Sequence, residues 1–286
     1  RTRHARGSRS RHGASKSVPA SLRPANDVSL VHLVGAEGAG QAYVSTILAH
    51  ISATCGYFVE TDNVLVRTAH AQQLPANMKA LLEMFKYNEF SPSRKVAILQ
   101  NLVLPTSETV LTSTAKSALK RRGGQNDLQW MFTQAKQVNV SMRVLHVSRD
   151  LAATLAAQSQ EVPISSRVTA VKEYFEFINS EYKRGSAKDQ DSWTQAKYEW
   201  FAQSANSSET VATGRKRRSR SAVECNALVL ALAAFAGWDG CETDVVCDQL
   251  RSVPPPEEVI IPSGVKAAAK RIKNTVPNDI PFLRAV

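Results

Sequence analysis

The chain has 286 residues, of which 43% are hydrophobic and 21% charged, a composition typical of a globular protein with a hydrophobic core. Its 36 lysines and arginines exceed its 25 acidic residues, which gives a formal net charge of +11. No run of 18 or more apolar residues occurs, so we predict no membrane-spanning helix in this sequence.

Positive charge is concentrated in two segments. Residues 1–26 are rich in Arg, Ser and Gly and contain no acidic residue, so we expect a disordered basic leader there. Residues 215–220 add five more cations. Some basic segments of this kind bind nucleic acid, but more often they are solvated linkers. A basic nucleic-acid-binding protein is therefore one alternative. We do not expect it to be the correct one, and we expect no nucleic-acid partner.

Strand and helix patterns alternate as far as residue 150. The apolar run Val28–Val34 predicts a first strand, and Gln41–Thr54 predicts a first helix. Further strands are expected at 56–60, 101–105 and 142–148, with helices at 78–87, 127–138 and 151–158 between or after them. This alternation predicts an α/β fold, in which helices flank a mostly parallel sheet.

Beyond Pro163 the patterns predict helices only. They cover residues 165–182, 193–205, 223–235 and 265–272, and the last is short and basic. We accordingly divide the chain into a basic leader (1–26), an α/β domain (27–250) and a C-terminal tail (251–286).

A glycine-rich turn joins the first predicted strand to the first predicted helix. Backbone N–H groups at a helix start attract anions, and the glycines at 35, 38 and 40 let an anionic oxygen approach them closely. The spacing Gly35-x4-Gly40 is that of a P-loop, but Gln41 and Ala42 occupy the positions of its Lys and Ser/Thr. The turn therefore predicts a phosphate cradle, and a divergent P-loop nucleotide-binding protein or kinase is a second alternative.

Two polar residues follow other predicted strands. Because ligands of doubly wound sheets bind beyond the carboxyl ends of the strands, Glu60 and Arg149 are candidate site residues. Arginine binds a phosphate through two parallel hydrogen bonds, so Arg149 and the turn together predict a two-phosphate pocket. Glu60 is the best-placed carboxylate to act as a general base.

Three segments resemble the sulfotransferase family that uses 3′-phosphoadenosine 5′-phosphosulfate (PAPS). Residues 127–157, with a helix leading into a strand that ends in Arg149-Asp150, resemble its 3′-phosphate segment. Residues 38–45 resemble its phosphosulfate-binding turn, and residues 223–238 resemble its late helix. The resemblance implies a P-loop-like, sulfotransferase-type fold and PAPS as the cofactor, with no metal.

The resemblance also implies a function and a set of site residues. The function is transfer of a sulfuryl group to a hydroxyl of a carbohydrate or other acceptor, with Glu60 as the catalytic base. The residues implied in cofactor binding are Gly38, Ala39, Gly40, Gln41, Ala42, Arg149 and Ser159.

The chain departs from the family pattern at two positions. The usual Lys or Arg of the turn is absent, since Gln41 donates only a neutral hydrogen bond. Ala157 replaces the usual serine, for which Thr154 or Ser159 can substitute. We therefore expect cofactor binding with weakened catalysis, unless Arg67, Lys86 or residues 215–218 supply the missing charge.

Cysteines and sequons bear on the compartment. Cys241 and Cys247 have the wrong spacing for a zinc site, and either a disulfide between them or free buried thiols fits the sequence. Sequons begin at Asn139 and Asn206. Together with the resemblance they favour a secretory route, in the Golgi lumen or anchored to a membrane by a segment upstream of Arg1, and a cytoplasmic location stays open.

Overall fold

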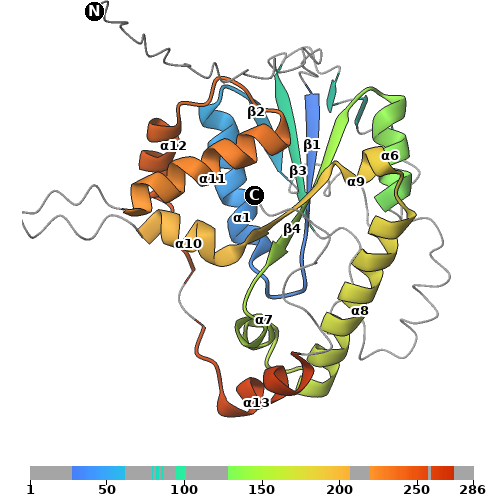
Figure 1. Ribbon diagram of the computed structural model, residues 1–286, viewed down its shortest axis with the longest axis vertical. Coiled ribbons are helices and arrows are strands. Elements are labelled where there is room, and N and C mark those ends of the chain that lie inside the picture. Colours follow the sequence, from blue (N-terminus) through green and yellow to red (C-terminus); the bar gives the residue numbers. More distant parts are fainter. Residues whose placement is uncertain are drawn as a thin grey trace, which may run out of the picture.

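The computed structural model describes residues 28–61, 79, 82–83, 85–86, 94–100, 128–206, 220–256 and 259–273. Within them, five strands form one all-parallel sheet in the order β2-β3-β1-β4-β5 (Figure 1). The strands are β1 (Val28–Val34), β2 (Phe58–Thr61), β3 (Lys95–Gln100), β4 (Ser141–Ser148) and β5 (Trp193–Lys197). The predicted α/β class with a parallel sheet is therefore confirmed.

Helices cover both faces of this sheet. One face packs against α1 (Gln41–Thr54), α10 (Tyr198–Asn206), α11 (Arg220–Ala236) and α12 (Thr243–Leu250). The other packs against α6 (Leu128–Gln137), α7 (Leu151–Ala157), α8 (Ile164–Arg184) and α13 (Ser263–Ile272). A short helix, α9 (Ala187–Gln190), precedes β5. We call these the α1 face and the α8 face.

β1 shows why the sequence forms this three-layer arrangement. All seven of its residues are buried, because a central parallel strand has helices on both sides. Side chains alternate along it, so Val31 and Leu33 enter the core of the α1 face while Leu30 and Val34 enter that of the α8 face. A continuous apolar run is thus the expected signature, and it was the clearest strand signal in the sequence.

The prediction of helices only beyond Pro163 is wrong at residues 193–205. Residues 193–197 form β5, which pairs in parallel with β4, and α10 begins only at Tyr198. Trp193 enters the core of the α8 face and Ala196 that of the α1 face, so the period of this segment is that of a strand. The five-residue strand is too short for its alternation to outweigh the helical pattern that follows.

Other predicted elements differ in their limits. β3 occupies Lys95–Gln100, ahead of the strand predicted at 101–105, a segment that lies outside the described residues. Helix α12 was not predicted at all. The basic leader, Arg67 and the cations at 215–218 also lie outside the described residues.

Two disulfides join the cysteines in a pairing that the sequence did not predict. Cys55, which caps the end of α1, bonds to Cys241, and Cys225 of α11 bonds to Cys247 of α12. The predicted alternatives, a Cys241–Cys247 bond or free thiols, are therefore both wrong. Close spacing in the sequence did not identify the partners, because the fold brings α12 alongside both α1 and α11.

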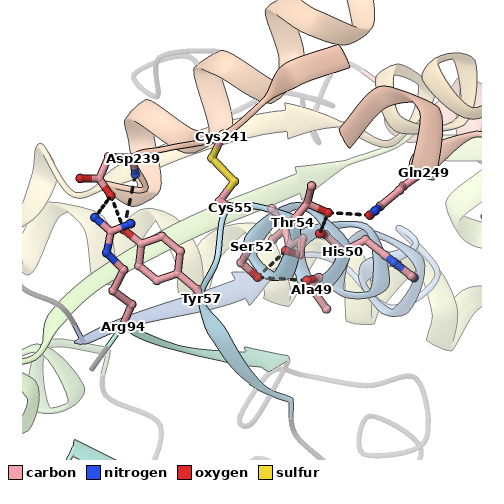
Figure 2. Close-up of a disulfide and its surroundings, with 11 residues drawn as sticks. Ala49, His50, Ser52, Thr54, Cys55, Tyr57, Arg94, Asp239, Cys241 and Gln249 are labelled. Carbon is pink, nitrogen blue, oxygen red and sulfur yellow. Dashed lines mark hydrogen bonds and ion pairs between the residues drawn. A yellow bond between two sulfur atoms is a disulfide. The ribbon is translucent and has the colours of Figure 1, made fainter. Parts of the chain in front are cut away.

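The Cys55–Cys241 bond lies beside a polar cluster that also joins distant segments (Figure 2). Arg94 forms an ion pair with Asp239 at 2.6 Å, and the Tyr57 hydroxyl donates a hydrogen bond to the same carboxylate at 3.1 Å. The Arg94 guanidinium also lies 5.4 Å from the centre of the Tyr57 ring. The segment before α12 is therefore joined to the end of α1 by a covalent bond, and to the residues that precede β2 and β3 by a hydrogen bond and an ion pair.

The tail is anchored to the α8 face through its helix. α13 buries Val265, Ala269 and Ile272 against that core, and it lies beside α7 and α8 in Figure 1. Its four cations, Lys266, Lys270, Arg271 and Lys273, are exposed. Among the described residues, no helix is both long and apolar enough to cross a membrane.

Candidate functional site

The candidate site lies where the chain leaves β1 and β4 in opposite directions. From β1 the chain turns to α1 on one face of the sheet, and from β4 it turns to α7 on the other. In an open parallel sheet such a switch between adjacent strands leaves a crevice at their carboxyl ends, which is where ligands bind. The predicted glycine turn, which joins β1 to α1, and Arg149, which directly follows β4, are both at this point.

Two glycines shape the turn between β1 and α1. Gly38 and Gly40 have φ angles of 88° and 91°, in the left-handed region that residues with a Cβ rarely adopt. A Cβ at Gly38 would also clash with the carbonyl oxygen of Thr154, and one at Gly40 would clash with the ring of Tyr198. Both positions therefore require glycine for conformation and for close packing.

The turn leads directly into the start of α1. Gly40 is the N-cap of this helix, and no side chain caps it in the described part of the chain. The amide of Ala39 donates to the carbonyl of Ala36 at 2.9 Å, which closes the turn on itself. The positive end of the α1 dipole therefore points into the crevice, which favours a negatively charged group there.

Gln41 occupies the inside of the turn. Its side chain is buried, and its amide nitrogen donates to the Ala36 carbonyl at 3.0 Å. A Cβ at Gly35 would clash with this amide. Gln41, which occupies the position of the P-loop lysine, thus stabilises the turn through a neutral hydrogen bond.

Arg149 follows β4 and lies against the turn. Its guanidinium donates to the Gly38 carbonyl at 3.3 Å and sits 4.3 Å from the centre of the Tyr198 ring. It makes no ion pair with any described residue. The neighbouring Asp150 is used otherwise, because its carboxylate caps α7 by accepting from the amides of Ala152 and Ala153, each at 3.0 Å. The guanidinium charge is therefore held in place by an aromatic face and a carbonyl rather than neutralised.

Helix α7 closes the other side of the site. The Gln158 amide donates to the Glu37 carbonyl at 2.8 Å, so the end of α7 is tied to the turn. Thr154 is buried beside Arg149, and its hydroxyl lies 3.5 Å from the Arg149 carbonyl. Ser159, the other predicted replacement for the missing serine, is exposed beyond the end of α7. Of the two, Thr154 is the hydroxyl that lies at the site.

A small cavity, with room for about one water molecule, lies beside Arg149. It is polar near the end of β4, at Ser148, Arg149 and Thr154, and apolar where Val171 and Phe175 of α8 line it. Its lining combines polar and apolar groups, but the enclosed space is far smaller than the roughly 300–1,000 Å³ of a ligand pocket.

Glu60 is not brought to the turn. The strand pairing sets Glu60 level with Ala97, and Ala97 level with Leu30, which is four residues before the end of β1. Four residues along a strand span about 13 Å, and two strand spacings add about 10 Å sideways. Burial raises the pKa of the Glu60 carboxyl, and the nearby charge of Lys95 opposes this shift. Glu60 is thus a half-buried carboxylic acid in β2, far from the glycine turn at the carboxyl end of β1.

Lys86 and two buried histidines of the sheet are the other polar groups to place. Lys86, a predicted source of charge, donates to the Val138 carbonyl at 2.8 Å, which lies at the opposite end of β4. His32 is buried in β1, and burial lowers its pKa to about 4. His146 is buried in β4, where its ring stacks on Tyr174 and lines the cavity beside Arg149. In the described ranges, no group of three or more His, Cys, Asp or Glu side chains is placed to hold a metal ion.

Sequence reasoning missed two residues of the site, Tyr198 and Gln158. Tyr198 directly follows β5, at the carboxyl end of a strand. Because residues 193–205 were predicted as one helix, this position was not recognised. A strand prediction for 193–197 would have found it. No local signal marked Gln158, because its role depends on how α7 packs against the turn.

Comparison with known proteins does not assign the chain to a family. No family model matches it, and no curated protein matches it significantly.

Proposed function

We propose that this chain is a sulfotransferase-like protein that binds PAPS at the glycine turn and Arg149, and that its acceptor is a hydroxyl of a carbohydrate or similar molecule. The observation that carries the proposal is the position of Arg149. Its guanidinium lies against the turn, makes no ion pair with the described residues, and faces the same crevice as the uncapped start of α1.

These two features suit a ligand with two anionic groups. The helix start supplies backbone N–H donors and a partial positive charge for one phosphate, and the guanidinium supplies a full charge for another. At present Arg149 makes one long hydrogen bond to a neutral carbonyl. A phosphate oxygen would give it shorter, charge-assisted bonds, which are roughly twice as strong. A 3′,5′-substituted adenosine nucleotide carries its anionic groups at two separate positions, as the site requires.

The residues that would hold PAPS are Gly38, Ala39, Gly40, Gln41, Ala42 and Arg149. PAPS supplies an activated sulfuryl group, and in the transfer the bond from its sulfur to the phosphate oxygen breaks as the acceptor oxygen bonds to sulfur. Gln41 offers the turn no positive charge, and its amide already donates to Ala36. We therefore propose that transfer is slow relative to binding, because charge developing on the leaving phosphate has no cation beside it in the turn.

The disulfides support a secretory location for this activity. All four cysteines are paired, and disulfides form and persist in oxidising compartments. Carbohydrate hydroxyls on proteins and lipids are abundant acceptors along that route. We propose the Golgi lumen as the place where the protein acts.

Thermal shift with three ligands tests the proposal. The chain is heated with adenosine 3′,5′-bisphosphate, with ATP and Mg²⁺, and with a short DNA duplex. We expect the bisphosphate to give the largest rise in Tm, because a ligand that binds only the folded state stabilises it. A larger shift with ATP would favour the P-loop nucleotide-binding alternative, and one with the duplex alone would favour the nucleic-acid-binding alternative.

Arg149→Ala tests the site itself. Loss of a charge-assisted hydrogen bond costs about 1.5–3 kcal/mol, so we expect the bisphosphate Kd to rise by roughly 10- to 150-fold. Lys266→Ala is the matched control, since it removes an exposed cation of α13 and leaves Arg149 in place. Calorimetric titration measures both. Equal affinity in the wild type and Arg149→Ala would refute the proposed pocket.

A further inference from the structure

We infer that Asn139 is a site of N-linked glycosylation. Asn139 and Val140 lie in the turn between α6 and β4, and Ser141, the first residue of β4, completes an Asn-x-Ser sequon. The candidate nucleotide site makes no use of this turn. The inference stands on the conformation of the turn, on its position in the fold and on the state of the cysteines.

The turn presents the Asn139 side chain to solvent. Asn139 has a φ of 54°, the left-handed conformation that asparagine tolerates better than most residues. It is exposed, whereas its neighbours Val138 and Val140 are buried. Its carboxamide makes no hydrogen bond with the described residues. The nitrogen that would carry a sugar is therefore available for modification.

The backbone that carries this side chain is well fixed. The Asn139 amide donates to the Lys136 carbonyl at 3.1 Å, and the Val140 amide donates to the Ala135 carbonyl at 2.9 Å. The Lys86 ammonium donates to the Val138 carbonyl at 2.8 Å. A glycan attached here would extend from a rigid corner of the fold without disturbing a packed side chain.

The position of the turn leaves the candidate nucleotide site open. Asn139 precedes β4 and Arg149 follows it, so the eight residues of the strand separate them. At about 3.3 Å per residue this is about 26 Å. The sugar would thus stand at the amino end of the parallel sheet, while the glycine turn and Arg149 are at the carboxyl end.

The disulfides supply the second requirement, a compartment where the modification occurs. Cys55–Cys241 and Cys225–Cys247 account for every cysteine in the chain. Such bonds are typical of proteins that fold in the lumen of the endoplasmic reticulum, where N-linked glycans are added.

The proposed step is a transfer from a lipid pyrophosphate-linked oligosaccharide. The Asn139 amide nitrogen bonds to the anomeric carbon of the first sugar, and the bond between that carbon and the pyrophosphate oxygen breaks. The amide nitrogen loses one proton to a base of the transferase, and the lipid pyrophosphate leaves. The Ser141 hydroxyl completes the acceptor sequence two residues downstream.

Expression of the whole chain behind a secretory signal in eukaryotic cells tests the inference. Treatment of the secreted protein with peptide N-glycosidase should lower its mass and convert Asn139 to Asp, which peptide mass spectrometry detects. Asn139→Asp should remove this glycan while keeping a residue that tolerates the left-handed conformation. Adenosine 3′,5′-bisphosphate binding should be unchanged in that variant.

A matched pair of variants separates glycosylation from folding. Ser141→Ala destroys the sequon, and Ser141→Thr preserves it, so only the first should lose the glycan. Asn206→Gln removes the other predicted sequon and should leave the Asn139 glycan in place. An unmodified Asn139 peptide from secreted, disulfide-bonded wild-type protein would overturn the inference, and so would a glycan found at Asn206 alone.

Discussion

The two faces of the sheet are stabilised in different ways. All four cysteines lie on the α1 face, where one disulfide joins α1 to the segment before α12 and the other joins α11 to α12. The α8 face has no disulfide, and its core contains the buried polar side chains of His32, His146 and Tyr174. One face is held by covalent bonds, and the other depends on packing around groups that resist burial.

This difference separates two responses to conditions. A disulfide stabilises a protein mainly by restricting its unfolded state, so the α1 face responds to reduction. A buried histidine must stay neutral, so the α8 face responds to acid. Both ring nitrogens of His32 are buried without a hydrogen-bond partner among the described residues. The comparison therefore predicts a protein that is sensitive to reductant through one face and to pH through the other.

Removal of Cys55–Cys241 should have the largest effect. The bond closes a loop of 186 residues, for which the loop-entropy relation gives about 5 kcal/mol. We expect the variant Cys55→Ala/Cys241→Ala to lose roughly that much free energy of unfolding, as measured by urea denaturation. The ion pair between Arg94 and Asp239 remains in that variant, and a loss below about 1 kcal/mol would mean that this cluster alone fixes the segment.

Removal of Cys225–Cys247 should cost less. Its loop spans 22 residues, which corresponds to about 3 kcal/mol by the same relation. The variant Cys225→Ala/Cys247→Ala, measured in the same urea titration, isolates the link between α11 and α12. If its loss exceeded that of the Cys55–Cys241 variant, native packing rather than unfolded-state entropy would dominate on this face.

The sequence predicted one half of the site better than the other. The turn and Arg149 could be placed at the carboxyl ends of neighbouring strands, because the apolar runs of β1 and β4 are typical of buried parallel strands. Tyr198 could not, because β5 has only five residues and continues directly into a helix. Long apolar strands were predictable from local pattern, whereas the short edge strand depends on its pairing with β4.

The cysteine pairing and the position of Glu60 depended on tertiary structure. Four cysteines allow three pairings, and sequence spacing does not choose among them. Glu60 lies within the second strand rather than after it, and the register of β2 with β3 sets it about four residues behind the end of β1. Register between strands distant in sequence is determined by the whole core, so a local pattern cannot reveal it.

The smallest predicted effect concerns the α8 face and pH. Burial lowers the pKa of His32 from 6.5 to about 4, so between these values the unfolded chain binds a proton that the folded protein does not. The contribution of neutral His32 to the free energy of unfolding is therefore complete above pH 6.5 and falls as pH drops towards 4, by about 1.4 kcal/mol per pH unit. Between neutral pH and pH 5 this amounts to about 2 kcal/mol.

His32→Leu should remove this part of the acid sensitivity. Urea denaturation of the wild type and the variant between pH 7.5 and 5 gives the difference in free energy of unfolding at each pH, so contributions from other titrating groups cancel. We expect the variant to gain about 2 kcal/mol relative to the wild type over that range. His50→Gln, at an exposed position of α1, is the control for replacing a histidine. A constant difference between His32→Leu and wild type would show that the α8 face tolerates acid, and that the contrast between the two faces is one of covalent linkage alone.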